Sequence, residues 1–117
     1  MKTPQLAVSA LLVACAATSC GLARYKCRAR QSEAKATLGQ IKAAETSYFG
    51  EHKTYTASTE DLHLPIAARY YSIELSITGG GKGYEAVAKG DKPDTTGDEW
   101  SVTESTAVTA KHDKCED

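Results

Sequence analysis

The sequence predicts an α+β fold in which one long N-terminal helix packs on a roughly four-stranded antiparallel sheet. Two features of the hydrophobic pattern support this prediction. Between residues 24 and 51, apolar side chains recur every three or four positions, as on one face of an amphipathic helix. From residue 69, apolar side chains alternate with polar ones, as in half-buried strands. A helix followed by a run of antiparallel strands is an α+β arrangement, with the sheet on one side of the helix.

The predicted helix spans residues 24–51. Its apolar stripe consists of Ala34, Leu38, Ile41, Ala44 and Tyr48. The residues off this stripe, which are expected to face water, are Gln31, Lys35, Lys42 and Glu45. Lys42 and Glu45 have the i,i+3 spacing of a weak ion pair. Gly39 costs about 1 kcal/mol relative to alanine, and a close approach of a strand at that position would offset the cost. Gly50 is the expected stop signal.

A loop and four strands are predicted after the helix. Residues 52–67 show no sustained period and are rich in turn-forming side chains. The first two strands, within residues 69–77 and 84–89, flank a glycine-rich turn and form a hairpin. Their expected buried faces are Tyr71, Ile73, Leu75 and Ile77 on the first and Tyr84, Ala86 and Ala88 on the second. A third strand begins at Trp100 and Val102, and a turn at 104–106 leads to a fourth strand at 107–111.

Composition and motifs exclude several classes of function. The 117 residues are enough for one domain, and the net charge of −1 argues against a nucleic-acid partner. The sequence has no ordered Ser/His/Asp set, nucleophile elbow, phosphate loop or HExxH motif. His52, His63 and His112 are scattered and are expected at the surface. We therefore expect a non-enzymatic protein with no small-molecule substrate.

The first two dozen residues have a different character. Lys2 precedes an apolar run, Leu6 to Ala17, which is short for a bilayer-spanning helix and typical of a signal-peptide core. The small residues Thr18 and Ser19 then lead into Cys20, and this pattern resembles the lipobox of bacterial lipoproteins. The resemblance implies that the cysteine receives a diacylglyceryl group and becomes the first residue of the mature chain. Residues 1–19 are thus expected to be a signal peptide or membrane segment, and residues 20–117 the domain.

Two cysteines compete as the site of lipid attachment. The sequence LVAC, ending at Cys15, fits the lipobox consensus better than ATSC, ending at Cys20, but it leaves an apolar core of only about nine residues for the signal. Attachment at Cys20 leaves Cys27 and Cys115 as an even pair in an oxidising compartment, whereas attachment at Cys15 leaves an odd thiol. Cys20 is the preferred site, Cys15 is the alternative, and a chain without lipid is the third possibility. Cys27 and Cys115 are the predicted disulfide.

A second resemblance covers most of residues 24–104. The segment RYKCRARQSEAKATLGQIKAAETSYFGEHKTYTA, residues 24–57, resembles type IV pilins and pilin-like proteins of the deltaproteobacterial kind. In that family a hydrophobic helix runs into a basic patch, a QSEAK-like segment, an apolar pair, aromatic residues and a Thr-Tyr turn. The matching positions are Arg24 to Arg30, Gln31 to Lys35, Leu38 with Ile41, Tyr48 with Phe49, and Thr54 with Tyr55. The later GDEWSVTE, residues 97–104, resembles the strand that follows the acidic loop in the same group.

The pilin resemblance implies the same fold and a structural role, but the N-terminus departs from the family. The chain begins MKTPQL in place of a prepilin processing site, and the family's acidic position falls near Thr3. One hypothesis is a pilin-like domain recruited to a lipid anchor; another is a degenerate pilin whose residues 3–23 still form the membrane helix. Either way, we expect an exported protein anchored to a membrane, in the periplasm or at the cell surface of a Gram-negative bacterium. Its expected partners are envelope proteins or proteins of a pilus or secretion-type assembly.

An acidic loop is the one candidate metal site. Asp91, Asp94, Asp98 and Glu99 crowd this loop, and Ca²⁺ takes several carboxylate and carbonyl oxygens from flexible loops. Some secretion pseudopilins of similar layout bind calcium in the corresponding loop. The spacing is not that of an EF-hand, and Pro93 restricts the loop, so a solvated turn is the preferred interpretation and calcium binding the alternative. A periplasmic lipoprotein that acts as a binding module for calcium or a protein, unrelated to filaments, is the second functional hypothesis.

Overall fold

The computed structural model describes residues 3–66 and 68–116, and within residues 3–20 it describes only the backbone. Helix α1 runs from Thr3 to His52. The sheet consists of β1 (Tyr71–Thr78), β2 (Gly83–Gly90), β3 (Glu99–Thr103) and β4 (Thr109–His112). Short 3₁₀ turns lie at Gly79–Gly81 and Lys114–Glu116. The four strands are antiparallel in the order β1-β2-β3-β4, so the predicted α+β fold is confirmed.

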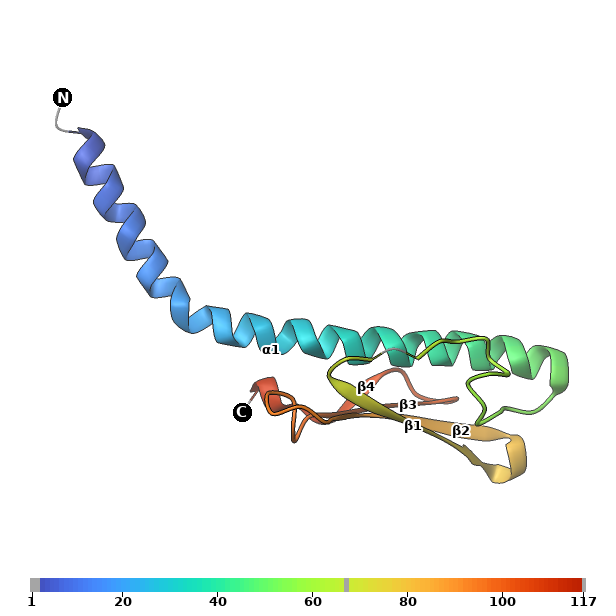
Figure 1. The fold of residues 1–117 in the computed structure, drawn as a ribbon. Coiled ribbons are helices and arrows are strands. Elements are labelled where there is room, and N and C mark those ends of the chain that lie inside the picture. The colour runs from blue at the N-terminus through green and yellow to red at the C-terminus, as the bar shows by residue number, and fades with distance from the viewer. Residues whose placement is uncertain (1–2, 67, 117) are drawn as a thin grey trace.

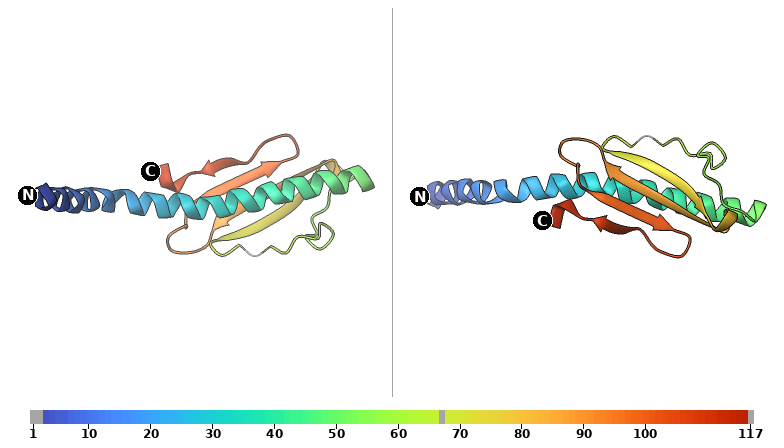
Figure 2. Two further views of the ribbon diagram at one scale, coloured as in Figure 1. Left: turned by 90° about the horizontal axis from the view of Figure 1, so that it is seen from above. Right: turned by 90° about the horizontal axis from the view of Figure 1, so that it is seen from below.

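The sheet covers only the C-terminal part of α1. Its strands cross beneath the helix at an oblique angle, and the N-terminal part of the helix projects beyond them (Figures 1 and 2). The molecule is consequently elongated, with extents of 74 × 27 × 23 Å. The loop after α1 returns from the far end of the helix and runs beside β1 (Figure 2).

The core lies between one face of α1 and one face of the sheet. The fully buried apolar residues of the helix are Ala34, Leu38 and Ile41. The sheet presents two cross-strand rows to them, Leu75–Ala86–Val102 and Ile73–Ala88–Trp100. The central positions of both rows are alanines, and their small side chains let the helix approach β2 closely. Burial of Leu38 and Ile41 contributes about 2 kcal/mol each relative to exposure. The predicted inward faces are confirmed: Tyr71, Tyr84, Ala86 and Ala88 are buried, and Ile73, Leu75 and Ile77 are half-buried against the core.

Two predictions about the water-facing side of the helix are wrong. Gln31 and Glu45 are only 3% and 0% exposed. Each side chain has a partner inside the protein: Gln31 donates to Asp98, and Glu45 Oε1 accepts from the backbone N–H of Thr56. Buried polar groups are tolerated where such partners exist. The water-facing prediction holds for Lys35, which is exposed and lies over the Trp100 ring with its Nζ 4.5 Å from the centroid.

The expected Lys42–Glu45 pair is replaced by longer-range contacts. Lys42 Nζ donates to the carbonyls of Thr103 and Thr106, at 2.9 and 2.7 Å. A charged donor with two carbonyl acceptors fixes the turn after β3 against the helix. The Glu45 carboxylate instead holds the loop that follows the helix.

The remaining differences concern glycines and element ends. Gly39 is exposed and a β-carbon there would have no atom within 4 Å, so the expected strand approach does not occur. The helix begins at Thr3 rather than at residue 24, and it ends at His52, two residues after Gly50. The fourth strand begins at Thr109, two residues later than predicted.

Candidate functional site

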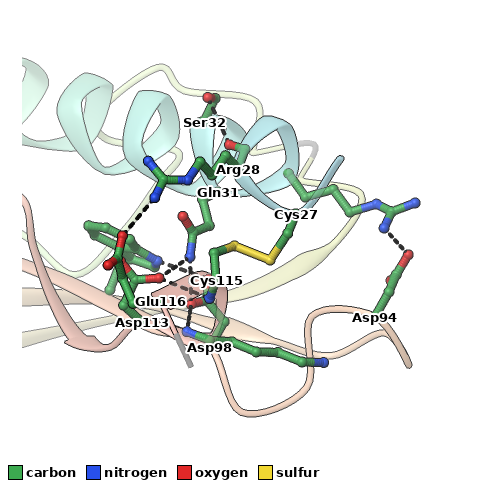
Figure 3. The surroundings of a disulfide bond; sticks show 12 residues. Cys27, Arg28, Gln31, Ser32, Asp94, Asp98, Asp113, Cys115 and Glu116 are labelled. Carbon is green, nitrogen blue, oxygen red and sulfur yellow. Dashed lines mark hydrogen bonds and ion pairs between the residues drawn. A yellow bond between two sulfur atoms is a disulfide. The ribbon is translucent and has the colours of Figure 1, made fainter. Parts of the chain in front are cut away.

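The two ends of the predicted domain meet at one corner of the molecule, which we call the disulfide corner: Cys27, Arg28, Gln31, Asp98, Asp113, Cys115 and Glu116 (Figure 3). Cys27 of α1 forms a disulfide with Cys115 of the last 3₁₀ turn, across a sequence separation of 88 and a Cα–Cα distance of 5.8 Å. The predicted pairing is confirmed. The residues that follow the two cysteines, Arg28 and Glu116, form an ion pair with 2.8 Å between a guanidinium nitrogen and a carboxylate oxygen. Both side chains are more than half exposed, so this pair contributes little on its own.

A buried polar network lies directly beside the disulfide. Gln31 Nε2 donates to Asp98 Oδ1 at 3.0 Å and to Asp113 Oδ1 at 2.7 Å. Asp113 Oδ1 also accepts from the backbone N–H of Cys115 at 3.0 Å. A single glutamine of the helix therefore connects the loop before β3 with the C-terminal turn (Figure 3).

Asp98 is the centre of this network. Its carboxylate accepts hydrogen bonds from four groups: the Gln31 amide, the Tyr71 hydroxyl, the Trp100 indole N–H and the Lys114 backbone N–H. Two carboxylate oxygens offer about four lone-pair sites, so these donors fill them. Asp98 is only 3% exposed and thus ties α1, β1, β3 and the C-terminal turn together. Burial, the hydrogen bond to Asp98 and neighbouring carboxylates all raise the pKa of the Tyr71 hydroxyl, which remains a donor.

The four acidic residues predicted to bind calcium do not act together. Asp98 has its acceptor sites filled by protein donors, and Asp94 forms an ion pair with Arg30 (Figure 3). Asp91 is exposed, and Glu99 belongs to β3. Among residues 21–66 and 68–116, whose side chains the structure describes, no three His, Cys, Asp or Glu side chains are grouped as a metal ion would require. The side chains present do not fit the calcium site that was predicted for this loop.

The acidic loop is folded tightly against the sheet. The backbone N–H of Gly90 donates to the Asp98 carbonyl at 2.9 Å, and Thr95 Oγ1 donates to the Tyr70 carbonyl at 2.8 Å. A β-carbon at position 90 would collide with the Thr95 carbonyl group. Glycine is required here so that the loop can close and place Asp98 under the helix.

A second buried polar site lies at the other end of the core. Glu45 is fully buried, and burial raises its pKa, with the Thr56 backbone N–H acting in the opposite direction. Burial and the nearby Glu45 raise the pKa of Tyr84 to about 12. Within the described part of the chain, Glu45 Oε2 and the Tyr84 hydroxyl have no hydrogen-bond partner. Close by, the Tyr84 backbone N–H donates to Glu104 and lowers the pKa of that carboxyl.

The other residues named from the sequence are spread over the surface. His52, His63 and His112 are all exposed, as predicted. The side chains of Cys15 and Cys20 lie outside the described part of the structure, so lipid attachment stays a prediction. Where the structure describes the helix in full, no stretch of it has both the length and the apolarity needed to cross a membrane.

Comparison of the sequence with models of known protein families gave no match, and neither did comparison with curated proteins.

Proposed function

We propose that this protein is a non-enzymatic cell-envelope protein, tethered to a membrane by its N-terminal segment, that presents a pilin-like α+β domain to a pilus or secretion-type assembly. The tether is a lipid on Cys20, with Cys15 as the alternative. Residues 1–19 are then a signal peptide; without lipid they stay in the membrane as part of the helix.

The observation that carries this proposal is the division of α1 into two parts. The sheet, the disulfide and the polar network all contact the helix from Cys27 onward. The N-terminal part, which contains the apolar run from Leu6 to Ala17, extends past the domain (Figure 1). A helix that is packed at one end and projects at the other suits a tether joined to a presented domain.

The described residues support a role in contact rather than in chemistry. The groups with the largest pKa shifts, Tyr71 and Tyr84, are buried and serve the packing of the fold. The surface elements available to a partner are β1, which is an eight-residue edge strand, and the shorter edge strand β4. Exposed edges carry unpaired backbone groups and are natural docking sites for other proteins.

The intact mass of the protein extracted from its native membrane tests the proposal. A chain that starts at Cys20 and is heavier by a diacyl or triacyl group would support the lipid tether. Globomycin, which blocks cleavage before the lipidated cysteine, is the matched control: the treated chain should keep residues 1–19 and still carry the diacylglyceryl group. A full-length chain without lipid that still sediments with membranes would favour the helical tether, and a lipid-free soluble protein would refute both.

Cross-linking in native membranes then tests the role in an assembly. Filament or secretion subunits among the cross-linked neighbours would support the proposal. Neighbours drawn only from other envelope proteins would instead favour the periplasmic lipoprotein that acts as a binding module.

A further inference from the structure

The helix segment just before the disulfide is both basic and unusually exposed. We call it the collar: Leu22, Arg24, Tyr25, Lys26 and Ala29. Leu22 is 53% exposed and Tyr25 is 71% exposed, and they are the large hydrophobic side chains that stand out on the described surface. Residues 21–32 contain four basic side chains and no acidic one. Neither Leu22 nor Tyr25 packs into the core of the domain, so the fold itself gives no reason for large apolar side chains at these positions.

The apolar members of the collar share one face. Leu22, Tyr25 and Ala29 are spaced by three and four residues, which aligns them along the helix. Beside them lies a hollow of about 300 Å³, lined by Tyr25, Lys26, Ala29, Arg30 and Tyr70. The guanidinium of Arg30 lies 5.0 Å from the centroid of the Tyr70 ring and closes one side of the hollow.

The basic residues divide into two groups. Arg28 and Arg30 form ion pairs with Glu116 and Asp94, so their charges are compensated within the domain. Arg24 and Lys26 are exposed, and neither forms an ion pair with any carboxylate in the described part of the protein. On the α-helix Lys26 lies beside this apolar face and Arg24 on the opposite side, so the collar carries an uncompensated positive charge on each side.

We propose that the collar docks on an anionic phospholipid surface, with Leu22 and Tyr25 in the headgroup region and Arg24 and Lys26 on the lipid phosphates. This inference rests on the proposed tether, which brings the collar to the membrane. At a rise of 1.5 Å per residue, Tyr25 lies about 7.5 Å along the helix from Cys20. A lipid on Cys20 would therefore hold the collar close to the headgroup region.

The chemistry of the collar favours lipid over a protein partner. Tyrosine with a neighbouring apolar residue is typical of the membrane–water interface, and basic residues beside a membrane segment bind anionic headgroups. Each Lys or Arg near such a surface strengthens binding about fivefold. Arg24 and Lys26 together should therefore strengthen docking of the collar by about twenty- to thirtyfold, and added salt should weaken it.

The test uses the full-length protein, purified from its native membrane and reconstituted into vesicles. One set contains phosphatidylcholine alone, and the other contains phosphatidylcholine with phosphatidylglycerol. Hydroxyl-radical labelling of Tyr25 reports docking, and Tyr48, half-buried at the far end of the helix, is the internal reference. We expect Tyr25 to be labelled severalfold less in the anionic vesicles, and high salt to restore the labelling.

Two double variants distinguish the positive charge of the collar from the net charge of the whole protein. Arg24→Gln with Lys26→Gln should return the labelling of Tyr25 to its level in phosphatidylcholine. Lys53→Gln with Lys82→Gln removes the same charge at the other end of the domain and should leave the protection intact. All four side chains are exposed, so neither variant disturbs the core.

Each contrary result overturns a defined claim. If the protein floats with both vesicles but Tyr25 is labelled equally, the collar inference fails and the tether stands. If the Arg24/Lys26 variant behaves like the wild type, the role of the charges is refuted. Protection that depends on protein density and not on headgroup would mean that a second protein covers the collar. A protein that floats with neither vesicle refutes the inference and the tether together.

Discussion

Removal of the Cys27–Cys115 disulfide is expected to lower the free energy of unfolding by about 4.6 kcal/mol. The bond closes a loop with a sequence separation of 88 residues. In the chain-entropy model a loop of that length restricts the unfolded chain by about 15 cal/mol/K, which gives this figure at 25 °C. Small domains have unfolding free energies of about 5–15 kcal/mol, so the bond supplies a large share of the total.

Urea titration followed by circular dichroism measures this effect. The full-length oxidised protein is compared with Cys27→Ala/Cys115→Ala, which cannot form the bond. Because the released chain exposes more surface on unfolding, the slope against urea should also rise. The control is reductant, which should shift the wild type to the curve of the variant and leave the variant unchanged. A loss below about 1 kcal/mol with an unchanged slope would refute the reasoning; it would mean that the bond restrains only the C-terminal turn.

Three further predictions concern the buried polar sites and the acidic loop. Asp98→Ala leaves the Trp100 indole and other buried donors unpaired, so the free energy of unfolding should fall by about 3–5 kcal/mol. Urea titration measures this loss. As the control, Asp91→Ala at an exposed position of the same loop should change the free energy of unfolding by less than about 0.5 kcal/mol. Because folding raises the pKa of Glu45, the stability linked to it is greatest below its usual pKa of 4.5 and is lost as the pH rises through the raised value. In unfolding titrations between pH 4 and pH 8, Glu45→Gln should therefore lack the loss of stability that the wild type shows as the pH rises. At pH 8 the variant should be no less stable than the wild type. If stability depends on pH equally in the two proteins, Glu45 is not the group responsible. Thermal melts with calcium and with EDTA should coincide, and a higher melting temperature in calcium would restore the predicted calcium site.

The spacing of apolar residues along the sequence predicts the helix and the strands well, because burial in the structure follows the same spacing. The strands at residues 71–78, 83–90 and 99–103 lie within about two residues of their predicted positions. Polarity is a poorer guide to the helix stripe, because it excludes two residues that are buried. Buried positions on the helix follow one another at spacings of three and four, namely Gln31, Ala34, Leu38, Ile41 and Glu45. The spacing therefore identifies the buried face of the helix, but the first and last residues on that face, Gln31 and Glu45, are polar, and polarity alone assigns them to the water-facing side.

The polar network could not be predicted in the same way. The partners of Gln31 lie 67 and 82 residues away, and the partner of Glu45 comes from a loop without a period. The acidic loop shows the converse. Its four carboxylates are neighbours in the sequence, yet Asp94 pairs with the partly exposed Arg30 of the helix, Asp98 is buried against Gln31, and Glu99 belongs to a strand. Proximity in the sequence does not determine which way a side chain points. The disulfide was predictable because the expected lipid attachment at Cys20 and removal of Cys15 leave only Cys27 and Cys115 to pair.

The position of the disulfide also decides how the domain would carry tension. Cys27 lies before every strand and Cys115 lies after every strand, so the covalent bond bridges the whole folded segment. A force applied between the N-terminal end of the helix and the C-terminus of the protein would pass through two sulfur atoms, and the sheet between them would bear almost none of it. A force applied at the hairpin around Gly80 would instead act on the strand hydrogen bonds, so the mechanical strength of the domain would depend on where a partner takes hold.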